Sequence, residues 1–318
     1  MRVISARFAY AGRMIRTARL LILGVGLMLV ASSAKVGQLP IPRQMLIVTA
    51  TPVVLSANSK AGAALGRLSF LAGWTLSSRH TDFGGWSAMS ATPSGFRLVS
   101  DAGAVLDLPL PGPARLAGWL QELPKGCGTH WNKEWHDAES TTSDVKGGWW
   151  VALELSNVIC RFTPDGRVRA VIPPRMASWA NALGAEAMVR LRDGRFLIFA
   201  EADPVHRQGP SPVLLFRDDP LTGGKADMLR LQSPEGFHPS DAAELPDGRI
   251  LVLQRHFALP LRWRSRLILL DPAALRQGAT LSGREIARLE PPFITDNFEA
   301  LAVTQEKRRT IIWLASDD

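Results

Sequence analysis

Residues 181–201 read NALGAEAMVRLRDGRFLIFAE, and the architecture that we expect follows from this stretch. An acid, Glu186, opens a short apolar run, the dipeptide Asp193-Gly194 follows, and a second apolar run ends in another acid, Glu201. Asp-Gly dipeptides adopt positive φ readily and close β-hairpins. We therefore predict two short strands joined by a tight turn. A hairpin returns the chain to the end at which it started, so the two acids are expected side by side.

The same plan occurs five times along the chain, each time with a polar residue that opens the hairpin and one that follows it. The pairs are Ser87 with Asp101, Glu139 with Glu154, Glu186 with Glu201, Asp241 with Arg255, and Glu299 with Asp317. The opening residues are 52, 47, 55 and 58 residues apart. A repeat of about 50 residues built from short strands is typical of β-propeller blades. We predict an all-β propeller of six blades, five of which are visible as hairpins, with the opening residues around one mouth of its channel.

The N-terminal segment has the composition of an export signal. Residues 1–34 hold five arginines and no acid, and an apolar run of 12 residues, LLILGVGLMLVA, precedes Ser-Ser-Ala. This order is typical of a signal peptide, with cleavage expected after Ala34. The run is short for a membrane span, which needs about 20 residues, and an uncleaved anchor remains the alternative. We expect the protein in the periplasm or secreted, with membrane contact only through an uncleaved segment.

The rest of the chain divides into residues 35–64, a linker or closing strand, and residues 65–318, the propeller domain. The sequence ends inside what the repeat makes a second strand. Either a strand from the N-terminal region closes the propeller, or the chain is incomplete. No stretch has the pattern of a long amphipathic helix.

The overall charge of +8 gives little support to a nucleic-acid partner. Five of these charges lie in residues 1–34, and the remaining chain carries 32 basic and 29 acidic residues, a net charge of +3. A nearly balanced surface has no strong attraction for nucleic acid. We expect a monomer that acts on a small molecule. Cys127 and Cys160 either pair in an oxidising compartment or stay separate thiols, and both interpretations are open.

Several common catalytic signatures are missing. The chain has no GxSxG nucleophile elbow, no HExxH zinc motif and no glycine loop of the kind that holds phosphate. The histidine-phosphatase motif RHGxRxP is also absent, since neither Arg-His dipeptide is followed by glycine. Serine-nucleophile, zinc-peptidase and histidine-acid mechanisms are therefore not expected.

The opening acids are the candidate metal ligands. If the hairpins meet at one mouth, four carboxylates lie together there: Glu139, Glu186, Asp241 and Glu299. Carboxylates crowded in this way repel one another and need a cation or protons to coexist. Hard oxygen ligands suit Ca²⁺, which takes six to eight of them. In the competing structural interpretation, the acids accept backbone N–H groups and tie neighbouring blades together.

The hairpins together resemble the bacterial family named "esterase-like activity of phytase", the phytase-like domain. The resemblance covers about residues 65–318. It rests on GGWS at 84–87 with Asp101, GAEA at 184–187 with Glu201, PSDAA at 239–243 with Arg255, and DNFEA at 296–300 with SDD at 316–318. The family name implies an exported, propeller-like protein with esterase or phosphoesterase activity.

From the acids and the resemblance, we predict a cation-assisted hydrolase of phosphoester or carboxyl ester bonds. Glu186, Asp241 and Arg255 are the predicted catalytic residues, with Arg255 binding a phosphate through its planar guanidinium. Two alternatives remain: a non-catalytic propeller that binds a ligand or partner, and a metal-dependent propeller of the lactonase type.

Overall fold

The computed structural model describes residues 2–8, 41–56, 64–112, 114–127, 137–180, 183–203, 205–206, 209–259, 262–307 and 309–317. In these ranges the chain forms β-strands and three short 3-10 turns: η2 (Met176–Ser178), η3 (Pro220–Thr222) and η4 (Pro272–Ala274). The prediction of an all-β chain is confirmed. Among the described residues, no helix has the length and apolar character needed to cross a membrane.

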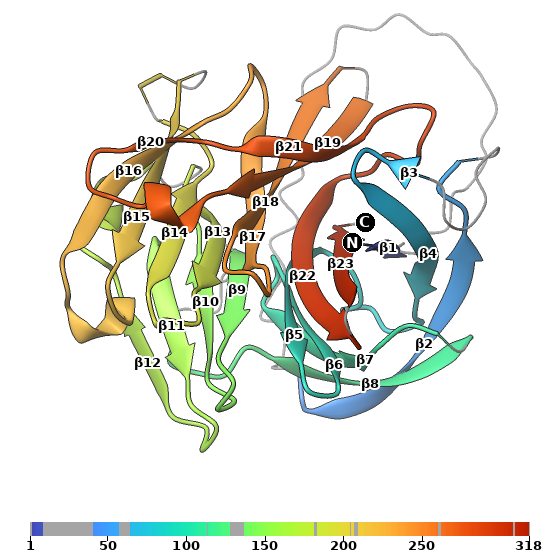
Figure 1. The fold of residues 1–318 in the computed structure, drawn as a ribbon. Coiled ribbons are helices and arrows are strands. Elements are labelled where there is room, and N and C mark those ends of the chain that lie inside the picture. Colours follow the sequence, from blue (N-terminus) through green and yellow to red (C-terminus); the bar gives the residue numbers. More distant parts are fainter. Residues whose placement is uncertain are drawn as a thin grey trace, which may run out of the picture.

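The antiparallel strands of the first three blades follow one another in the chain (Figure 1). The first blade consists of β5 (Trp86–Thr92), β6 (Gly95–Ser100), β7 (Ala104–Pro109) and β8 (Arg115–Glu122). The second consists of β9 (Ala138–Ser143), β10 (Trp149–Leu153), β11 (Val158–Phe162) and β12 (Val168–Val171). The third consists of β13 (Ala185–Arg190), β14 (Phe196–Ala200), β15 (Ser211–Phe216) and β16 (Ala226–Gln232).

The strands of the fourth and fifth blades are not all consecutive in the chain. The fourth contains β17 (His238–Glu244), β18 (Ile250–Ala258), β19 (Arg262–Leu270) and β21 (Arg284–Leu289), while β20 (Thr280–Ser282) adds to the third blade beside β16. The fifth begins with β22 (Phe298–Glu306) and β23 (Arg309–Ser316). Four N-terminal strands extend it: β1 (Arg2–Phe8), β2 (Gln44–Val53), β3 (Ala64–Leu65) and β4 (Leu68–Ser77). Because β2 pairs with both β4 and β8, the fifth and first blades share one ten-stranded sheet.

The five leading strands form a closed ring. The strands β5, β9, β13, β17 and β22 each contact the next, and β22 contacts β5 again. Five apolar clusters fill the spaces between neighbouring blades. The described residues therefore form four sheets with five inner hairpins. The sixth blade that the sequence suggested is not confirmed, since five leading strands already contact one another around the ring.

The alternation of side chains along each strand explains why the blades stack. In β14, Leu197 and Phe199 enter the cluster between the third and fourth blades, whereas Phe196 and Ile198 enter the cluster between the second and third. Successive residues of a strand point to opposite faces. A continuous apolar run such as FLIFA therefore supplies both faces of a blade buried on two sides.

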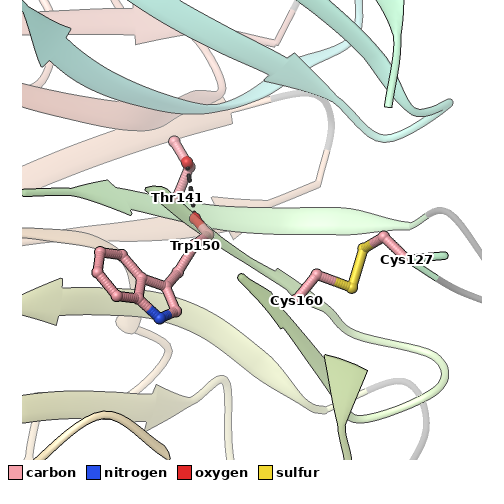
Figure 2. The surroundings of a disulfide bond; sticks show 4 residues. All are labelled: Cys127, Thr141, Trp150 and Cys160. Carbon is pink, nitrogen blue, oxygen red and sulfur yellow. Dashed lines mark hydrogen bonds between the residues drawn. A yellow bond between two sulfur atoms is a disulfide. The ribbon is translucent and has the colours of Figure 1, made fainter. Parts of the chain in front are cut away.

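The two cysteines form a disulfide, which settles the question that the sequence left open. Cys127, in the connection after the first blade, bonds to Cys160 of β11 in the second. Figure 2 shows the indole of Trp150 pointing away from this bond, while Thr141 donates a hydrogen bond to the Trp150 carbonyl at 2.9 Å. The disulfide packs in the cluster between the first and second blades, and Trp150 packs in the next cluster.

Most of the predicted signal segment lies outside the described residues, so the signal and its cleavage stay predictions. Within it only β1 is described, and this strand pairs in parallel with β23 and β4. The predicted linker or closing strand at 35–64 contains β2. The domain boundaries likewise stay predictions.

Candidate functional site

Each leading strand carries a β-bulge near its start, where the pairing with the next strand skips one residue. A bulge leaves its residue out of the ladder and redirects its side chain, and bulges are common beside active sites. The bulged residues are Ser87, Glu139, Glu186, Ser240 and Glu299. The fourth blade therefore has Ser240 at this position, with Asp241 one residue further along.

Acids from the second, third and fifth blades meet at the end of the ring where the leading strands begin. Carboxylate oxygens of Glu154, Glu186 and Glu201 all lie within 4.8 Å of one another, and so do those of Asp137, Glu139 and Glu154. Glu154 belongs to both groups. Glu299 of the fifth blade is close enough to raise the pKa of Glu139 and Glu186. We call these six residues the acidic cluster.

The guanidinium of Arg255 is the cation inside this cluster. Its Nη1 donates to Glu299 Oε1 and, at 3.0 Å, to Asn297 Oδ1. Its Nη2 lies 3.5 Å from Glu186 Oε2 and 3.8 Å from Glu201 Oε1. Burial alone would lower the pKa of Arg255, but the surrounding carboxylates outweigh it and raise that pKa above its ordinary value. One positive charge thus faces three carboxylates from two other blades.

Gly184 fixes the acids of the second and third blades relative to each other. Its N–H donates to Glu154 Oε1 at 3.1 Å, and its carbonyl accepts the N–H groups of Glu186 and Glu201. A Cβ at this position would lie 2.8 Å from Glu154 Cγ and from the Glu154 carbonyl oxygen. Only glycine allows this approach, so the Gly-Ala-Glu-Ala opening is a requirement of the site.

The cluster holds its protons more tightly than ordinary carboxyl groups do. Burial raises the pKa of Glu154 to about 7, against the opposing hydrogen bond from Gly184. Burial likewise raises the pKa of Glu299 to about 7, although Arg255 acts in the other direction. Burial and then the neighbouring carboxylates raise the pKa of Glu139 well above its usual range. For Glu186, burial again raises the pKa, and Arg255 does not cancel the effect.

The structure brings Glu139, Glu186, Glu299 and Arg255 together, but it does not bring Asp241 into the acidic cluster. Asp241 is 1% exposed and accepts the N–H of Ala242 at 2.7 Å and that of Leu301, in the next blade, at 2.6 Å. Burial raises its pKa well above the usual value in spite of these two bonds. These contacts match the structural interpretation of an acid that ties two blades, and we give Asp241 no place in the proposed site.

Replacing Asp241 with asparagine should therefore act on stability. The amide offers one accepting oxygen, so one of the two buried N–H groups loses its partner, at a cost of about 1–3 kcal/mol. Urea unfolding of the variant measures this loss. Asp218→Asn, on an exposed aspartate, is the matched control and should change little. An Asp241→Asn protein as stable as the parent would contradict the structural role.

The phytase-like family, described as "esterase-like activity of phytase", matches residues 81–318. The chain belongs to the phytase-like family. The resemblance seen in the hairpin motifs is thereby confirmed. No match was found among curated protein sequences.

Solved structures resemble the phytase-like chain only in general fold. Virginiamycin B lyase from Staphylococcus aureus is 12% identical with a TM-score of 0.41, and the match covers 86% of this chain and 82% of the lyase. A gluconolactonase from Xanthomonas campestris is 12% identical with a TM-score of 0.39, and the match covers 89% of this chain and 83% of the gluconolactonase. An auxiliary nutrient binding protein from Bacteroides thetaiotaomicron is 10% identical with a TM-score of 0.40, and the match covers 85% of this chain and 74% of the binding protein. Likenesses at this level carry no argument about function.

The acidic cluster of this phytase-like protein has the donor set that a hard cation requires. Two groups of three carboxylates share Glu154, and all their donor atoms are oxygens. Several of these carboxyls are buried, and Arg255 supplies one positive charge for them. Oxygen ligands of this kind suit Ca²⁺ or Mg²⁺ rather than softer metals. The residues therefore fit a divalent cation, although the structure does not identify the metal.

Three residues in or beside the acidic cluster were not predicted from the sequence. Asn297 donates to Glu299 Oε1 at 2.8 Å, Asp137 completes one acid group, and a ring nitrogen of His238 lies 3.1 Å from the Glu201 carbonyl oxygen. Asn297 and Asp137 precede a bulged glutamate by two residues, a signal that could have found both. The position of His238 follows from its pairing with Arg255 across β17 and β18, which the sequence alone did not show.

Proposed function

We propose that the protein hydrolyses ester bonds with a divalent cation held in the acidic cluster, and that phosphomonoesters are its preferred substrates. The observation that carries this proposal is the meeting of acids from three blades around a single guanidinium. Architecture alone does not require several buried carboxylates with raised pKa values to share one place. Perturbed carboxyl groups gathered in this way are common at functional sites. Membership of a family named for esterase activity supports the same reading.

The cation would be held by Glu154 and Glu186 together with Glu201, Glu139 and Asp137. We propose Ca²⁺ because every donor is an oxygen. A bound divalent ion would polarise the oxygen of the ester and favour ionisation of nearby water. The negative charge of a phosphomonoester could then be accommodated in a region that is otherwise repulsive to anions.

The protein's own groups supply proton transfer and charge. Both hydrogen bonds to Glu299, from Arg255 and Asn297, go to Oε1, so Oε2 is the oxygen on which a proton can be exchanged. With a pKa of about 7, this carboxyl can take a proton from water near neutral pH, as a general base requires. Arg255 keeps Glu299 and Glu186 in place, and its guanidinium would stabilise negative charge that develops beside it.

We also propose that the protein works outside the cytoplasm, in the periplasm or secreted, as a monomer. The disulfide between Cys127 and Cys160 supports this location because such bonds persist mainly in oxidising compartments. The signal-like composition of residues 1–34 agrees with it.

The direct test is hydrolysis of three chromogenic substrates: an aryl phosphate, an aryl acetate and a lactone. With Ca²⁺ present, we expect the aryl phosphate to release phosphate. In excess chelator, we expect this release to stop. Glu299→Gln should lower turnover by about 10²-fold or more because it removes the proposed base. Glu306→Gln makes the same change at the exposed far end of the same strand and should have no effect.

The substrate that reacts decides among the hydrolase classes. Opening of the lactone alone would favour the lactonase alternative. If none of the three substrates reacts with Ca²⁺ present, the protein is not the proposed hydrolase. That result would favour the alternative of a non-catalytic propeller that binds a ligand or partner.

A further inference from the structure

A cavity lies between the second and third blades, at the opposite end of their hairpins from the acidic cluster. Its volume is about 850 Å³, which is within the range of small-ligand sites. Its walls come from the turn after β9, the turn after β13 and the segment 218–222. Glu139 and Glu186 lie at the starts of β9 and β13, whereas the cavity borders the ends of these strands. The two sites are therefore separate.

Two arginines, one from each blade, flank the floor of this cavity. The floor is the indole of Trp150, which is 2% exposed. The guanidinium carbon of Arg161 lies 5.1 Å from the centre of this ring, and that of Arg190 lies 5.9 Å from it. Arg190 also lies 6.0 Å from the ring centre of Phe196. The ring of Trp150 thus has a guanidinium group of each blade beside it.

Most of the acids that line the cavity are already engaged. Asp219 pairs with Arg161 at 2.9 Å and accepts hydrogen bonds from Trp150 Nε1 and the N–H of Leu221. Asp144 accepts the N–H groups of its own turn, at Lys146 and Gly148. The remaining lining acid, Asp218, is exposed.

Two of the four cations that line the cavity have no carboxylate partner among the described residues. Within the described ranges, Lys146 and Arg190 form no ion pair, and the Nε of Arg161 is buried with no hydrogen-bond partner. Arg192 is held by Glu244 and by two backbone carbonyls. The cavity therefore presents guanidinium and ammonium donors that no carboxylate takes, with Arg190 Nη1 donating only to the Leu191 carbonyl oxygen, at 3.5 Å. The hydroxyl groups of Ser143 and Thr222 on its wall already donate to backbone carbonyls.

We propose that this cavity binds a small phosphate dianion, either free phosphate or the phosphate of a monoester. Guanidinium groups pair with phosphate oxygens through parallel N–H donors, and an ammonium adds a further charge. Arg161 and Arg190 approach from different blades, so an anion with several oxygens can bridge them. Arg190 and Lys146 supply the charge, and the half-buried guanidinium of Arg161 has N–H donors besides the Nη1 that pairs with Asp219.

Calorimetric titration of inorganic phosphate and of phenyl phosphate into the full chain tests the proposal. Chelator is present throughout, so that no cation in the acidic cluster contributes. We expect saturable binding with one site per chain. Arg190→Gln should weaken it at least about tenfold, and Lys146→Gln, on an exposed side chain, should weaken it several-fold. Tighter binding of phenyl phosphate would identify a monoester as the occupant. Tighter binding of inorganic phosphate would identify the free anion.

Arg169→Gln is the matched control, because Arg169 is an exposed arginine of the second blade that does not line the cavity. It should leave the affinity unchanged. Equal weakening in this control would show unspecific attraction by charge and overturn the site. The proposal is also overturned if the parent protein shows no saturable binding below about 10 mM, or if both cavity variants bind like the parent.

Discussion

Replacing Arg255 with methionine is expected to lower the free energy of unfolding at pH 8 by about 3–5 kcal/mol. Methionine keeps much of the side-chain volume but removes the charge that faces Glu186, Glu201 and Glu299. Breaking a buried ion pair on one side leaves the other charges without compensation, which costs far more than losing an exposed pair. Urea unfolding in chelator, without divalent cations, measures the difference.

Arg249→Met is the control for this experiment. Arg249 lies next to the start of the same strand and pairs with Asp247 in an exposed turn, at 2.6 Å. Exposed pairs contribute about 1 kcal/mol or less, so this variant should stay close to the parent. If Arg255→Met were as stable as Arg249→Met, Arg255 would not be neutralising the acidic cluster.

The stability of the parent protein is expected to fall as the pH rises from 5 to 8 in chelator. Glu154 and Glu299 have a pKa of about 7 in the folded protein, raised from 4.5. The folded state therefore keeps protons that the unfolded state has released. The resulting stabilisation is fully present below about pH 4.5 and is lost as the pH passes through 7. Each group can account for up to about 3 kcal/mol.

Urea unfolding at several pH values checks this expectation, and Glu154→Gln is the informative variant. Glutamine can still accept the Gly184 N–H but carries no titrating proton, so the fall in stability between pH 5 and 8 should be clearly smaller. The destabilisation of Arg255→Met should also shrink at pH 5, where the glutamates hold protons. A parent protein whose stability stayed constant or rose over this range would contradict the raised pKa values.

The sequence was sufficient to predict the hairpin repeat and that three of the four opening acids lie close together. The Asp-Gly turns set the hairpins, and Glu139, Glu186 and Glu299 stand at the same place in their blades. Asp241 could not be placed correctly because the motif does not show which residue is bulged. A shift of one residue decides whether a side chain reaches the mouth or the neighbouring blade.

Other features depend on contacts between distant parts of the chain. The number of blades could not be read from hairpin spacing, because β2 and β4 join the fifth blade to the first in one sheet. The anion cavity could not be predicted either. Arg161 and Arg190 are 29 residues apart, and neither belongs to a recognisable motif. Only the packing of two blades around Trp150 brings them together.

We propose that the acids of separate blades together hold one cation. Calorimetric titration of Ca²⁺ at pH 8 into the parent protein, Glu154→Gln and Glu306→Gln tests it most directly. We predict saturable binding to the parent and to Glu306→Gln, and at least a tenfold loss of affinity in Glu154→Gln, since Glu154 belongs to both acid groups. Absence of binding to the parent, or equal affinity in all three proteins, would contradict the claim.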